Sequence, residues 1–180
     1  MMRALRSTCL VLACGLSSLP FLAQPPEKHD PLTGPQIEQI REAGIFPDER
    51  VRLYTKFIDE HADKIKGFAD RSRSAARDQR LDSELQDFTS LMDELGSNLD
   101  TYSDRKADIR KSLKPLTEAT QRWMTMLRSL PDQQGYDLSL KEAIESGSDL
   151  SDQAKEMLAN QTQYFELHKD QRGQDRAEPQ

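Results

Sequence analysis

Cysteine is scarce in this sequence, and the two that occur, Cys9 and Cys14, lie within its first 14 residues. Small exported domains often depend on disulfides, because their apolar cores are limited. The part of the chain after Cys14 cannot form a disulfide within itself. We therefore expect its fold to be held by apolar packing alone.

Motifs of common catalytic and cofactor sites are also missing. None of the eight glycines lies in a Gly-x-Gly-x-x-Gly or Walker pattern, and Ser146-Gly147-Ser148 does not form the Gly-x-Ser-x-Gly elbow of hydrolases. No glutamate stands three residues before His29, His61 or His168, so the Glu-x-x-His pairs of bundle di-metal sites are missing, as is His-Glu-x-x-His. We expect no enzyme activity, no cofactor and no metal, with His61 and His168 at the edge of an apolar core instead.

A basic excess is lacking as well. The formal net charge is -6, and the first 23 residues contain two arginines and no acidic residue, so the rest of the chain is more acidic still. An acidic field argues against binding to nucleic acid or to an anionic membrane. We therefore expect no nucleic-acid partner.

One polar stretch nevertheless gathers four arginines: Arg71, Arg73, Arg77 and Arg80. Acidic residues are interspersed with them: Asp70, Asp78 and Asp82. Mixed charges of this kind are typical of a solvated bend, which is the interpretation we favour. The alternative is a basic patch for an acidic partner, a lipid headgroup or a cell-wall polymer.

The start of the chain has the composition of a secretory signal. Arg3 and Arg6 precede a short apolar run, a second apolar piece ends at Ala23, and no acidic residue occurs before Glu27. The apolar run is too short and too interrupted for a membrane span. We expect residues 1–23 to be a signal peptide cut after Ala23, residues 24–32 to be an extended linker, and the protein to be periplasmic or extracellular.

Two other readings of this segment remain open. The stretch could be retained as an N-terminal anchoring helix. Alternatively, Val11-Leu12-Ala13-Cys14-Gly15 resembles the lipobox of bacterial lipoproteins. That resemblance implies lipidation at Cys14 and a protein tethered to the cell envelope.

Helix signals begin at Thr33. Thr33 and Gln36 have the spacing of a capping box, and Gly44 is a typical stop after a short first helix. A second helix is expected from Pro47, because proline followed by Asp48 and Glu49 suits a helix start. Its apolar face repeats at steps of three and four: Val51, Tyr54, Phe57, Ile58, His61, Ile65 and Phe68.

A long seam follows, in which steps of four and three alternate without a slip: Leu81, Leu85, Phe88, Met92, Leu95, Leu99, Tyr102, Lys106, Ile109, Leu113, Leu116, Thr120, Trp123, Leu127 and Leu130. This spacing is typical of a coiled coil. Pro115 interrupts it, but the phase continues, so we favour one long helix kinked at Pro115 over two helices broken at Lys114. Lys106 would set the register of the seam or extend its ammonium group to water.

A turn at residues 131–137 leads to a last helix whose apolar face runs from Leu140 to His168. The sequence thus predicts an all-α fold: an antiparallel bundle of three long helices, or of four if the chain breaks at Pro115, with a short N-terminal helix. The bundle domain spans residues 33–171, and residues 172–180 form a disordered tail.

One short box resembles a known family. The residues Leu32-Thr33-Gly34-Pro35-Gln36 are similar to the Leu-Thr-x-x-Gln box of small periplasmic stress proteins, which form helical, cradle-shaped chaperone dimers. The likeness covers five residues, and a capping box produces the same letters for local reasons. It implies a chaperone-like protein that binds unfolded or apolar clients.

The length of the seam suggests where a partner would bind. Because the seam from Leu81 to Leu130 outlasts either neighbouring helix, we expect one of its ends to stay partly uncovered. The predicted contact residues are Leu81, Leu85, Phe88, Trp123, Met124 and Leu127. The functional prediction is an exported, non-enzymatic helical interaction or structural module with an unknown protein partner, a second copy of the chain being one candidate. The alternative is a chaperone-like stress protein.

Overall fold

The computed structural model describes residues 30–173. This part of the chain contains five α-helices, one short 3-10 helix and no strand, which confirms the all-α prediction. The helices are α1 (Gly34–Glu42), α2 (Pro47–Ala69), α3 (Ala75–Asp104), α4 (Arg110–Ser129) and α5 (Asp137–Leu167), followed by the 3-10 helix η1 (Lys169–Gln171). The predicted signal, Cys14, most of the linker and the tail from residue 174 lie outside the described residues.

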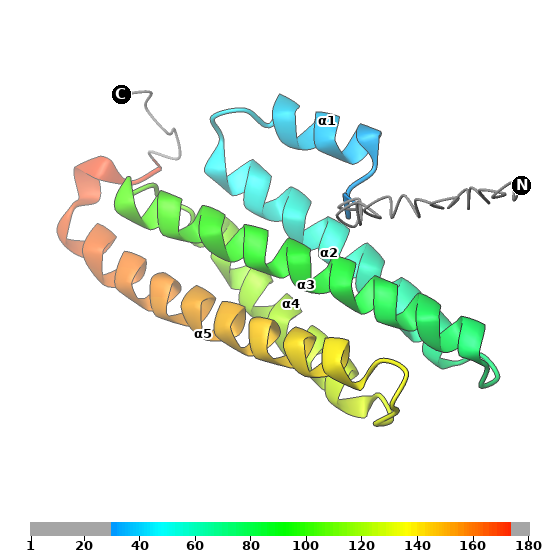
Figure 1. Cartoon of the computed structure of the whole chain (residues 1–180). Helices are drawn as coiled ribbons and strands as arrows, with labels where there is room; N and C mark the ends of the chain where they lie inside the picture. The colour runs from blue at the N-terminus through cyan, green and yellow to red at the C-terminus, as the bar shows by residue number, and fades with distance from the viewer. Residues whose placement is uncertain (1–29, 174–180) are drawn as a thin grey trace, which may run out of the picture.

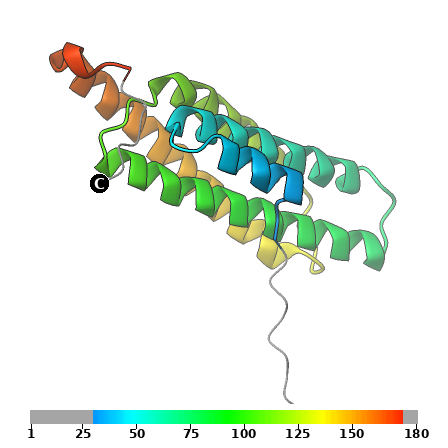
Figure 2. The same cartoon turned by 90° about the horizontal axis from the view of Figure 1, so that it is seen from above.

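The four long helices α2 to α5 form an elongated bundle in which consecutive helices run in opposite directions (Figure 1). Helices α2 and α5 each pack against both α3 and α4, whereas α3 and α4 are not neighbours in the described structure. They therefore lie diagonally across the bundle. Helix α1 is outside the bundle and packs against α2 alone among the described elements (Figure 2).

The predicted helix starts are confirmed at α1 and α2. The backbone N–H of Thr33 donates to Oε1 of Gln36 over 2.8 Å, which is one half of a capping box. Gly44 adopts a φ of 50° after α1, the left-handed conformation that favours glycine. Pro47 then occupies the first turn of α2, where its missing N–H costs nothing.

The long helix kinked at Pro115 is a wrong prediction, and so is a break at Lys114. The chain breaks earlier, between Asp104 and Arg110, and Pro115 lies inside α4. The proline removes the hydrogen bond that the carbonyl group of Lys111 would accept. Because Lys111 and Pro115 are both on the exposed side of α4, water can bind that carbonyl group instead.

Lys106 explains why the break gave no signal in the sequence. Its φ is 55°, and the N–H groups of Lys106 and Ala107 donate to the carbonyl oxygens of Ser103 and Tyr102 over 2.9 and 3.0 Å. This pattern is the Schellman motif, which usually has glycine at the left-handed position. Lys106 therefore lies in a turn, and the prediction that it sets the register of a continuous seam is wrong.

Replacing Lys106 with glycine is expected to raise the free energy of unfolding by about 1 kcal/mol, because glycine adopts a left-handed conformation without a steric penalty. Chemical denaturation of both proteins measures the change. The matched control is Lys155→Gly, at an exposed position inside α5, which is expected to lower stability by about 1 kcal/mol. A loss of stability in Lys106→Gly would contradict the assigned backbone conformation.

Two buried polar side chains fix the turn between α3 and α4. The side-chain amide of Gln161 accepts from the N–H of Ile109 over 3.1 Å and donates to the carbonyl oxygen of Ala107 over 2.9 Å. The carboxylate of Asp48 accepts from the N–H and the hydroxyl of Ser112 over 3.1 and 2.6 Å. Asp48 thus binds an N–H group in the first turn of α4, which has no side-chain cap of its own.

Candidate functional site

The six residues predicted to contact a partner are all buried, so the prediction that they are partly uncovered is wrong. None has an exposed fraction above 6%: Leu81, Leu85, Phe88, Trp123, Met124 and Leu127. The physical reason is the turn after α3. It reverses the chain, so the two halves of the seam face each other across the bundle axis instead of extending beyond their neighbours.

An aromatic contact at the centre of the bundle joins these two halves. The rings of Phe88 and Trp123 pack edge to face with their centroids 5.9 Å apart. Nε1 of Trp123 donates to Oδ1 of Asp59 over 2.7 Å, so its one polar atom is satisfied. The two aromatic residues therefore belong to the core.

The fold separates Arg77 from the other three arginines of the polar stretch at residues 71–80. Arg77 is buried and donates to the carbonyl oxygens of Phe68 and Ala69 at the end of α2, over 3.1 and 3.0 Å. It also donates to Oδ1 of Asp78 over 2.7 Å and to Oε1 of Gln133 over 2.9 Å. The other three arginines are exposed. Arg77 thus has a structural role and cannot contribute to a basic surface patch.

The chain matches no protein-family model, and comparisons with curated proteins and with solved structures return no match. Its function must therefore be inferred from its own residues. No helix in the described residues combines the length and the apolar character needed to cross a membrane.

His168 ends α5 and has local partners. Its ring stacks on Tyr164 with the centroids 4.1 Å apart, and Nδ1 donates to the carbonyl oxygen of Tyr164 over 2.9 Å. This interaction lies at the end of α5, where His168 is the C-cap residue.

His61 is different, because it lies in a polar cluster inside the apolar layer between α2 and α3. Its side chain is 2% exposed, and Nδ1 lies 2.5 Å from Oε1 of Glu84. The carboxylate of Asp87, one turn further along α3, is close enough that one ligand atom from each of the three residues lies within 4.8 Å of the others. We call His61, Glu84 and Asp87 the His61 cluster.

Lys64 approaches the same carboxylate from the surface. Its Nζ lies 3.1 Å from Oε1 of Glu84, and its side chain is 53% exposed. Burial alone would raise the pKa of Glu84, but the neighbouring His61 and Lys64 outweigh burial and lower the pKa below its ordinary value. Glu84 is therefore a carboxylate at neutral pH.

The sequence patterns of bundle metal sites do not predict the His61 cluster, because those patterns place a glutamate and a histidine on one helix. Here the histidine comes from α2, and the two acidic residues come from α3 at a spacing of three. The available signal was the position of His61 on the apolar face of its helix, together with two acids one turn apart on the next helix.

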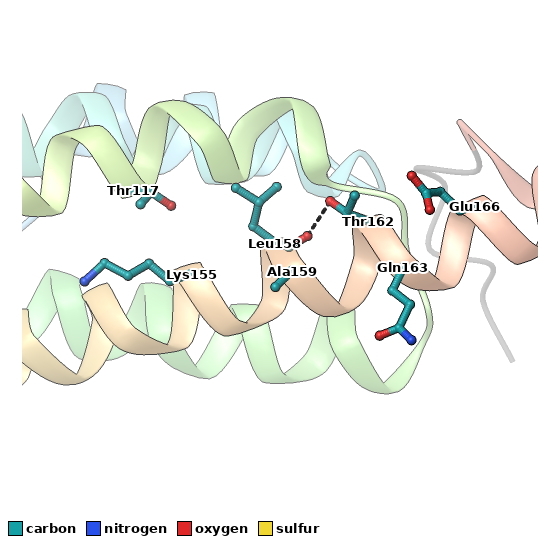
Figure 3. Close-up of a pocket in the computed structure, with 7 residues that line it drawn as sticks. All are labelled: Thr117, Lys155, Leu158, Ala159, Thr162, Gln163 and Glu166. Atoms are coloured by element: carbon teal, nitrogen blue, oxygen red, sulfur yellow. Dashed lines mark hydrogen bonds between the residues drawn. The ribbon is translucent and has the colours of Figure 1, made fainter.

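Figure 3 shows a shallow depression between α4 and α5, in which the charged groups of Lys155 and Glu166 lie at opposite ends. The hydroxyl of Thr162 donates to the carbonyl oxygen of Leu158 over 2.6 Å, so it is already engaged within α5. The groups around this depression do not converge on a common point as catalytic groups do.

Exposed apolar side chains occur on α1 and in the connection that follows it. Among the large apolar residues in the described structure, five are exposed, and three of these lie within ten residues: Ile37, Ile45 and Phe46, at 43%, 45% and 46%. Ile40 and Ala43, in the same segment, are buried. We call Ile37, Ile45 and Phe46 the α1 face.

Proposed function

We propose that this protein is an exported, non-enzymatic helical module that acts by binding a protein partner through the α1 face. The observation that carries the proposal is the exposure of three large apolar side chains within ten residues, one on α1 and two in the connection from α1 to α2. Exposed apolar groups cost free energy in water and are typical of interaction sites when they gather on a polar protein. Export is supported by the composition of residues 1–23.

The partner that fits best is a second copy of the chain. Arg41 and Glu38 pair with each other within α1, so the helix does not need a partner of opposite charge. Two copies related by a twofold axis would place the same apolar residues against one another, as in most homodimers. The large bundle core would not change in such a contact, because α1 lies outside it.

The test is the triple variant Ile37→Ser, Ile45→Ser, Phe46→Ser. We expect the wild-type protein to self-associate in light scattering at high concentration and to bind an apolar fluorescent dye, and the variant to lose both properties. Serine suits position 46, because this residue caps the start of α2. The fold should therefore survive, which circular dichroism verifies.

The matched control replaces Leu138 and Leu167 with serine, since these leucines are even more exposed but lie at the two ends of α5. We expect the control to behave as the wild type. A strict monomer that does not bind the dye would exclude a partner at the α1 face. If the wild type suppressed aggregation of a denatured client and the triple variant did not, the chaperone-like alternative would be favoured.

A further inference from the structure

We propose that His61, Glu84 and Asp87 form a binding site for one divalent transition-metal ion. The proposal goes beyond the partner-binding function and does not depend on it. It rests on the orientation of a buried histidine ring, on the geometry of its contact with Glu84, and on the charge gathered around it.

The first step is the orientation of His61. Nε2 lies 3.2 Å from the carbonyl oxygen of Pro31, and a carbonyl oxygen can only accept, so Nε2 carries a hydrogen. Metal-binding histidines usually donate their second ring nitrogen to a carbonyl or carboxylate oxygen in this way. The bond to Pro31 leaves Nδ1 as the ligand atom and aims it at α3.

The second step is the contact between Nδ1 and Glu84. Nδ1 and Oε1 are 2.5 Å apart, and Oε1 also pairs with Nζ of Lys64, yet neither Nδ1 nor Oε1 forms a hydrogen bond of ordinary geometry. An ion on the lone pair of Nδ1 would explain this arrangement. Oxygens that share a metal with a ring nitrogen lie beside the nitrogen–metal line rather than along it.

The third step is the donor set. One imidazole nitrogen with two carboxylates suits first-row divalent ions such as Zn²⁺, Mn²⁺ or Co²⁺. Two carboxylates would balance the charge of the ion, and the remaining coordination positions would be filled by water. The three ligand atoms lie within 4.8 Å of one another. Metal–ligand bonds of about 2.0–2.2 Å would require the carboxylate of Glu84 to move slightly away from Nδ1 and the other ligand atoms to move closer, by side-chain rotations.

Lys64 lies where the site meets the surface, and its positive charge opposes the binding of a metal ion. The side chain of Glu84 is 13% exposed, so an ion can reach it from the surface beside Lys64. The ammonium group of Lys64 lies 3.1 Å from Oε1 of Glu84, where it would repel a metal ion. Because Lys64 is largely exposed, its side chain can turn into water when the ion binds.

The experiment titrates the purified full chain with Zn²⁺ by calorimetry and repeats it with Co²⁺, whose absorption reports the coordination geometry. We expect one ion per chain, and we expect Glu84→Gln to weaken binding at least about tenfold. Lys64→Met should instead tighten binding by about two- to fivefold, because it removes a repelling charge. A merely structural role for the His61 cluster does not predict tighter binding.

Matched controls separate this site from adventitious binding. His168→Gln and Glu118→Gln change the same residue types, at the end of α5 and on the exposed side of α4, and should leave the affinity unchanged. His61→Gln should abolish binding, with circular dichroism as a test of folding. The proposal is overturned if neither ion binds, or if Glu84→Gln binds as tightly as the wild type.

Discussion

Replacing Phe88 with alanine is expected to lower the free energy of unfolding by about 3–5 kcal/mol. Phe88 is fully buried and packs edge to face on Trp123 at the centre of the bundle. The substitution removes most of the apolar side chain and leaves a cavity that the surrounding helices cannot close completely. Denaturant unfolding followed by circular dichroism measures the loss.

Phe46→Ala is the matched control, because the same chemical change is made at a side chain that is 46% exposed. We expect this variant to lose less than about 1 kcal/mol. The two variants also separate the role of the core from that of the α1 face, since Phe46→Ala should weaken self-association without unfolding the protein. A small stability loss in Phe88→Ala would mean that the seam is not the core.

Arg77→Met is expected to lower the free energy of unfolding by about 2–4 kcal/mol, the second largest effect after that of Phe88→Ala. The guanidinium group donates to two carbonyl oxygens at the C-terminal end of α2, and its positive charge suits that end of the helix. It also joins this end to Gln133 in the connection between α4 and α5. Methionine fills a similar volume but leaves these acceptors without a donor.

Arg73→Met is the control, because Arg73 is exposed and lies in the connection between α2 and α3. Its expected effect is within about 0.5 kcal/mol. Arg77→Lys should recover only part of the lost stability, since an ammonium group cannot reproduce the planar set of donors that reaches several acceptors at once. Equal losses in Arg73→Met and Arg77→Met would show that charge, rather than the buried hydrogen bonds, carries the effect.

The starts of α1 and α2 could be predicted from the sequence because their signals are local. A threonine three residues before a glutamine, or a proline in the first turn, fixes the helix start through its own backbone and side chains. The end of α3 could not be predicted, because Lys106 occupies a left-handed position that glycine usually fills. The stability of that turn comes from distant residues, including Gln161 on α5.

The prediction that seam residues contact a partner is wrong for a different reason. A regular seam shows which side chains face another helix, but it does not show whether that helix belongs to the same chain. Because the chain reverses direction at residues 105–109, Leu85 and Leu127 are both buried inside one molecule. The α1 face gave no comparable signal, since Ile45 and Phe46 lie in and beside a turn rather than on a repeating stripe.

The diagonal placement of α3 and α4 also bears on the order in which the protein can fold. The pairs α2–α3 and α4–α5 are consecutive in sequence and pack against each other, so each can form a helical hairpin from local contacts. The contact between Phe88 and Trp123 joins one hairpin to the other and must wait for the two to dock. The segment at residues 105–109 is therefore a tether between two early-forming halves, and its length limits how far apart they can drift before they meet.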